Sequence, residues 1–150
     1  MRLAAAALLL LLATATLAHS HEKGDIEVHH PWSRATPPGA KLAVGYMEIR
    51  NRGSQPERLL SASTAAAKRV EMHVTLREGE IMRMRQVPSF EIPAGERFAL
   101  RPGGSHLMLV GLTRSLEKGG RFRMTLRFER AGELEIELEV QEAGSRHPGH

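Results

Sequence analysis

Four residues near the middle of the chain have side chains that bind soft metal ions: His73, Met84, His106 and Met108. Ten residues separate the first His from the first Met, twenty-one separate that Met from the second His, and one separates the last pair. Imidazole and thioether are uncharged, soft ligands, and together they favour copper, especially Cu(I), over zinc, magnesium or calcium. We therefore predict a Cu(I) site formed by these four side chains.

The predicted strands around these residues indicate how they could share one ion. Residues 105–110 are apolar and follow a Pro-Gly-Gly turn, which favours a strand with His106 and Met108 on the same face. Alternation along residues 69–76 places His73 on the polar face, opposite to Met72. A tight connection at residues 78–80 leads to the segment carrying Met84, so His73 and Met84 are expected on paired antiparallel strands.

Taken one at a time, these residues have a plainer interpretation. A single Met in a strand is more often core filler than a ligand, and a lone His is more often a hydrogen-bonded rim residue. Two His-plus-Met groups in neighbouring segments favour the metal site instead. Alternation places Met82 on the same strand face as Met84, so only one side of that segment is rich in thioethers.

The spacing of the four residues resembles the motif of the periplasmic copper chaperones of the PCuAC family. The resemblance covers roughly residues 26–129 and includes the flanking stretches 31–39, 45–53 and 100–109. It implies a cupredoxin-like or immunoglobulin-like Greek-key β-sandwich that delivers copper for the assembly of the dinuclear centre of cytochrome c oxidase. The implied partner is an apo copper-site domain of that oxidase or another oxidase-assembly copper protein. Some members carry Met directly after the first His, where this chain has Val74, so the substitute for any auxiliary fifth ligand that the resemblance implies would be Met82.

The first residues have the pattern of a secretory signal peptide. A positive start at Arg2 precedes an Ala/Leu run over residues 3–12 and small residues up to Ala18. We expect cleavage after Ala18, with cleavage after Ser20 as the alternative, and a periplasmic location. We expect no stable membrane anchor, since the apolar run is shorter than the about 20 residues that span a bilayer.

Composition excludes several other functions. The chain contains no Cys, so it lacks the thiolate of a blue-copper carrier and the Cys-x-x-Cys of a thiol oxidoreductase. Thioether and imidazole ligands also persist in an oxidising compartment, where thiols form disulfides. Without Arg2, twenty basic residues stand against seventeen acidic ones, which is too mild an excess to indicate nucleic-acid binding.

Beyond the leader, the chain is expected to form one all-β domain, an antiparallel β-sandwich over residues 25–142. Many short strands separated by turn residues, with almost no helical periodicity, predict this class. Residues 19–24 are expected to be a flexible lead-in and residues 143–150 a flexible tail. Their histidines, His19, His21, His147 and His150, are candidates for a secondary Cu(II) site, and simple disorder is the alternative.

The residues around the four-residue motif favour binding over catalysis. No paired carboxylates and no Ser-His-Asp arrangement accompany it. Four soft ligands satisfy the coordination of a d10 ion, so we do not expect the ion to activate water. We therefore expect a monomeric, non-enzymatic Cu(I) metallochaperone. A copper buffer or resistance protein and an exported sandwich that binds another protein without metal remain the alternatives.

Overall fold

All regular elements in the part of the chain that the computed structural model describes, residues 20–149, are β-strands. No helix within residues 20–149 is long and apolar enough to cross a membrane. The predicted signal peptide, His19 and His150 lie outside the described residues. The strands are β1 (Ser20–Lys23), β2 (Ile26–Arg34), β3 (Leu42–Asn51), β4 (Glu57–Ser63), β5 (Ala67–Glu78), β6 (Ile81–Val87), β7 (Phe90–Ile92), β8 (Arg97–Leu100), β9 (His106–Leu112), β10 (Arg121–Phe128) and β11 (Gly132–Gln141).

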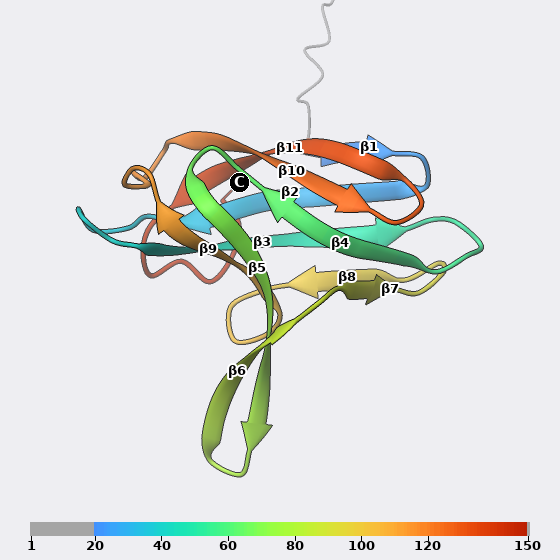
Figure 1. The fold of residues 1–150 in the computed structure, drawn as a ribbon, viewed down its shortest axis with the longest axis horizontal. Coiled ribbons are helices and arrows are strands. Elements are labelled where there is room, and N and C mark those ends of the chain that lie inside the picture. Colours follow the sequence, from blue (N-terminus) through green and yellow to red (C-terminus); the bar gives the residue numbers. More distant parts are fainter. Residues whose placement is uncertain (1–19, 150) are drawn as a thin grey trace, which may run out of the picture.

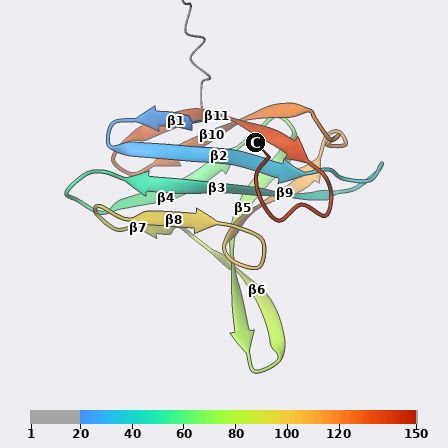
Figure 2. The same ribbon diagram turned by 180° about the vertical axis from the view of Figure 1, so that it is seen from behind.

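The strands form one hydrogen-bonded path that folds into two layers. Its order is β6-β5-β9-β3-β2-β11-β10-β4-β7, with β1 added beside β2 and β8 beside β3. Figure 1 shows β10, β4 and β5 in front, and Figure 2 shows β2, β3 and β8 in front when the molecule is turned around. The predicted all-β sandwich is confirmed, although one of its strand pairs, β2 with β11, is parallel.

The core lies between these two layers and follows the alternation of the strands. In β11 the apolar positions beginning at Leu134 are buried, while alternate positions carry Glu. This pattern is expected for a strand with one face on the core and one in water. The largest fully buried side chains come from both layers: Ile26, Ile49, Leu59, Ile92, Leu107, Leu109, Leu116, Met124, Leu126, Phe128, Ile136 and Leu138.

The first strands differ from the sequence prediction. The Pro of His29-His30-Pro31 is typical of a strand end, but β2 continues to Arg34 through a register shift between His29 and Trp32. His30 takes a positive φ of 48° at this irregularity, so the strand absorbs an extra residue as a bulge and then resumes. Residues 20–23, within the expected lead-in, form β1 and pair with β2.

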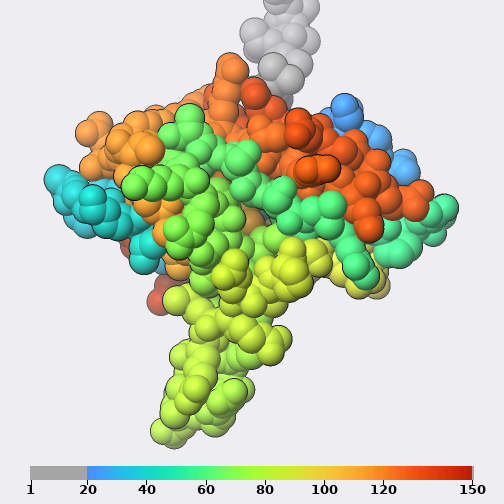
Figure 3. All heavy atoms as spheres, in the orientation of Figure 1, coloured from blue at the N-terminus to red at the C-terminus, as the bar shows by residue number. Residues whose placement is uncertain are grey.

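The β5–β6 hairpin extends away from the sandwich. We call residues 76–86 the β5–β6 arm; all of them are exposed. Figures 1 and 3 show this segment, in yellow-green, projecting from the body of the molecule. Since β6 is the last strand of the sheet path and pairs with β5, the arm is held to the domain mainly through β5.

Candidate metal centre

His106 is positioned by the turn that precedes β9. Gly103 has a φ of +80°, which a side chain would disfavour, and the turn closes through a Gly104 N–H to Arg101 carbonyl hydrogen bond of 2.9 Å. The carbonyl of Gly104 then lies 3.1 Å from His106 Nδ1. A carbonyl only accepts, so Nδ1 carries the proton in neutral His106, and Nε2 keeps its lone pair.

His73 is positioned by a carboxylate on its own strand. Its Nε2 lies 2.8 Å from Glu71 Oε2, and Arg69 Nε donates to the other carboxylate oxygen at 2.9 Å. The hydrogen bond from His73, followed by that from Arg69, lowers the pKa of Glu71, so this carboxyl is ionised at neutral pH. An ionised carboxylate only accepts, and His73 therefore donates through Nε2 and leaves the lone pair of Nδ1 free.

The two imidazoles face each other across strands β5 and β9. His73 and His106 are direct cross-strand partners, and their ring centroids lie 5.4 Å apart. Both nitrogens left without a proton, His73 Nδ1 and His106 Nε2, are buried and have no hydrogen-bond partner. Buried polar atoms without a hydrogen-bond partner are rare, and one explanation for such atoms is that they bind an ion. Metal–imidazole bonds of roughly 2 Å are compatible with one ion shared by two rings at this separation.

Met108 lies on the same face of the sheet as both histidines. It follows His106 by two residues on β9, where the intervening Leu107 is fully buried on the other face. Its cross-strand partner is Glu71, two residues before His73. Met108 is thus a diagonal neighbour of His73, a separation of roughly 7–8 Å that long side chains can bridge.

Met84 approaches the same face from the other neighbouring strand. His73 pairs with Gln86 and Thr75 pairs with Met84, which makes Met84 a second diagonal neighbour of His73. The predicted antiparallel pairing of the His73 and Met84 strands is confirmed. Unlike the histidines, Met84 is 60% exposed, because it stands on the β5–β6 arm. Met82 shares its face and is 55% exposed.

This donor set suits a soft ion better than a hard one. Two imidazole rings and two thioethers lie on one face. Burial lowers the pKa of His106, the hydrogen bond to the Gly104 carbonyl opposes this, and the nearby His73 adds to the lowering, which favours the neutral His106 ring. Within residues 20–149 no group of three or more His, Cys, Asp or Glu is arranged to hold a metal ion. The four-residue ligand set stays a prediction that this geometry favours.

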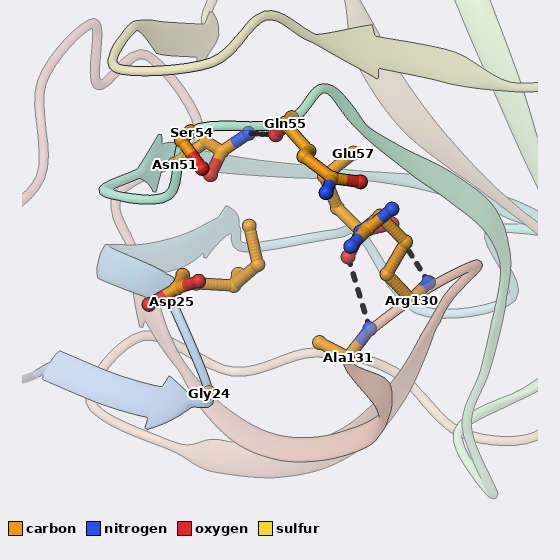
Figure 4. Close-up of a pocket in the computed structure, with 9 residues that line it drawn as sticks. Gly24, Asp25, Asn51, Ser54, Gln55, Glu57, Arg130 and Ala131 are labelled. Carbon is orange, nitrogen blue, oxygen red and sulfur yellow. Dashed lines mark hydrogen bonds between the residues drawn. The ribbon is translucent and has the colours of Figure 1, made fainter.

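A hollow lies at the opposite edge of the sandwich, and its lining residue Glu57 has a structural role. The hollow measures about 380 Å³ and is lined by Asp25, Asn51, Glu57 and Arg130, among others. Figure 4 shows Glu57 turned toward the β10–β11 turn, where its carboxylate accepts the backbone N–H groups of Arg130 and Ala131, both at 2.9 Å. The same carboxylate accepts the N–H of Arg58, so Glu57 serves to fasten this turn.

The terminal histidines are only partly within the described residues. His21 lies on β1, where its Nε2 accepts the backbone N–H of Glu137 at 3.3 Å. His147 lines a hollow of about 700 Å³ together with His29 and His30. The tail is attached to the sandwich by a 2.8 Å hydrogen bond from Arg34 Nε to the Ser145 carbonyl. The secondary Cu(II) site stays a prediction, since His19 and His150 lie outside the described residues.

Two groups at the centre were given no role by the sequence analysis. Glu71 lies on the same strand face as His73, and the signal for its role is a Glu two residues before a His on one strand. The Gly104 carbonyl is a backbone atom, so no residue type marks it. Its position depends on the turn, which the Pro-Gly-Gly stretch did predict.

The sequence of the chain matches a known protein family. The sequence profile of the family described as "Putative lipoprotein LpqE-like" matches residues 26–140. A putative lipoprotein, Lxx21020, of Leifsonia xyli subsp. xyli is 33% identical over 118 residues, covering 78% of this chain and 70% of that protein.

Solved structures place the fold among PCuAC domains. The apo PCuAC domain of PmoF2 has a TM-score of 0.75 at 31% identity, covering 86% of this chain and 99% of that one. The copper-bound PmoF2 domain gives 0.73 at 31% identity, covering 83% and 98%. The Cu(I) form of DR1885 from Deinococcus radiodurans gives 0.65 at 27% identity, covering 89% and 87%. The chain therefore belongs to the LpqE-like family and has the fold of the PCuAC domain, as its motif and flanking stretches indicated.

Proposed function

We propose that this protein is a Cu(I)-binding metallochaperone whose ligands are His73, Met84, His106 and Met108. The observation that carries the proposal is the pair of buried, unpartnered nitrogens, His73 Nδ1 and His106 Nε2, on facing rings. Copper-bound PmoF2 and Cu(I)-bound DR1885 share the fold and support copper as the ion. Family and fold are those of a binding protein and give no support to an enzymatic role.

The ligands differ in how firmly the sheet holds them, and this difference suits transfer. His73, His106 and Met108 stand on β5 and β9, which pair with each other inside the sheet, while Met84 stands on the exposed arm. Neutral ligands leave the Cu(I) complex with a net positive charge. An acceptor offering thiolates would replace Met84 first and then take the ion by stepwise ligand exchange.

We further propose that the protein is exported through its predicted signal peptide and acts in the periplasm as a monomer, and we infer its acceptor from the family resemblance. The acceptor would be an apo copper-site domain of cytochrome c oxidase or another oxidase-assembly copper protein. A buffer role is the second candidate, because the same site would also hold copper without passing it on.

The first test is a Cu(I) competition titration with a chromophoric chelator. The parent protein should bind one tight equivalent, and Met84→Ala and His106→Ala should each weaken it. Binding that is indifferent to both substitutions would contradict the site. Incubation of the loaded protein with an apo-oxidase copper domain then separates the two roles, since a chaperone transfers its copper and a buffer retains it.

A further inference from the structure

We propose that Glu71 is a positioning residue for the copper site, holding the His73 ring through Nε2 so that Nδ1 stays free for an ion shared with His106, and making that nitrogen a better donor. This inference rests on the proposed function. Its structural basis is a chain of three alternate residues on one face of β5, Arg69, Glu71 and His73, joined by hydrogen bonds of 2.9 and 2.8 Å.

The position of Glu71 indicates an indirect role in metal binding. One carboxylate oxygen accepts from Arg69 and the other from His73, so both are engaged. The contact is to Nε2, which leaves the buried Nδ1 without a partner, and no group of three His, Cys, Asp or Glu among residues 20–149 is arranged around an ion. Glu71 therefore acts on the metal through the imidazole of His73.

The carboxylate has two separate effects on His73. Its hydrogen bond fixes the ring orientation, because the side chain of His73 is only 15% exposed and its Nε2–H points at Glu71. Its negative charge makes the imidazole a stronger electron donor toward an ion on Nδ1. Carboxylate–histidine–metal arrangements of this kind typically change metal affinity by about 10–100-fold when the carboxylate is removed.

The two histidines are thus supported differently. A carboxylate partners His73, whereas the neutral carbonyl of Gly104 partners His106. Only the support of His73 can be changed by substituting a side chain. The chain also offers a matched control on β2, where His29 Nε2 lies 2.9 Å from Glu27 Oε2 with the same two-residue spacing. Arg52 also pairs with that carboxylate, at 3.0 Å.

The test compares Glu71→Ala, Glu71→Gln and Glu27→Ala in Cu(I) competition titrations. We expect Glu71→Ala to weaken Cu(I) binding by about 10–100-fold. Glu71→Gln should lie between this variant and the parent, since the amide oxygen still accepts from Nε2–H but carries no charge. Glu27→Ala should bind like the parent. A purely structural role would lower stability without this graded order of affinities.

A second readout uses the metal-free protein. The His73 Nε2–H proton should give a downfield, slowly exchanging NMR resonance that persists in Glu27→Ala and is lost in Glu71→Ala. Parent-like affinity of Glu71→Ala would overturn the inference while leaving the four-ligand site intact. Copper binding by the parent that is indifferent to His106→Ala would instead overturn the proposed function itself.

Discussion

Replacing His106 with leucine should stabilise the metal-free protein while removing its copper site. His106 is 5% exposed and buries Nε2 without a partner, a defect that costs about 1–3 kcal/mol. The substitution also loses the Nδ1–H bond to Gly104, worth about 0.5–1.5 kcal/mol. The Gly104 carbonyl keeps a partner, because the Thr75 hydroxyl donates to it at 3.1 Å. The net expectation is a gain of about 1 kcal/mol, or roughly 4 °C in Tm for a chain of this size.

The assay is urea and thermal unfolding with and without Cu(I). Free Cu(I) at about 100 times Kd should stabilise the parent by about 2.7 kcal/mol, and His106→Leu should gain nothing. His29→Leu is the control, because it removes a histidine whose Nε2 is already bonded to Glu27. It should slightly lower stability and retain the copper effect. A metal-free His106→Leu protein that is less stable than the parent, or one that copper still stabilises, would refute the reasoning.

Four further outcomes are expected. Met84→Ala should change the free energy of unfolding by less than about 0.5 kcal/mol, because Met84 is 60% exposed, yet weaken Cu(I) binding at least tenfold in the competition titration. Met72→Ala should show the reverse in the same two measurements, a loss of about 2–5 kcal/mol with unchanged copper affinity, since Met72 is 7% exposed and in the core. Because burial lowers the pKa of His106 below 6.5, the unfolded chain takes up the proton first, so metal-free stability should fall as pH drops below 6.5. Urea titrations between pH 8 and pH 5 check this, and the fall should be smaller in His106→Leu. Glu57→Ala should lower the unfolding midpoint in urea by freeing the N–H groups of the β10–β11 turn, with parent-like Cu(I) affinity.

Alternation along the chain predicted much of the site's arrangement. Alternation of side chains placed His106 and Met108 on one strand face and His73 on the face opposite the buried Met72. Both placements follow from the two-residue repeat of a strand. The same reasoning located most strands, because turn residues separate them. It missed the continuation of β2 past Pro31, since a bulge at His30 let the strand resume after an expected end.

Local sequence patterns do not determine which distant strands pair or in which register. The pairing of His73 with His106 depends on β5 lying beside β9, which the order of strands in the sheet determines and local sequence does not. The tautomers depend on contacts to Glu71 and to a backbone carbonyl. Motif spacing therefore identified the candidate ligands, while the donor atoms of the two histidines required the structure.

The structure also separates the two thioethers, which the motif treats alike. Met108 is fixed on β9 between β5 and β3, whereas Met84 is on strand β6, which ends the sheet path and pairs with β5. A site built this way keeps most of its ligands in place when one is withdrawn. If the arm provides the exchangeable ligand, then changes at Met84 should speed Cu(I) release to an acceptor more than changes at Met108. Stopped-flow transfer from the two Met→Ala variants would test this, and equal release rates would mean that the arm has no special part in the exchange.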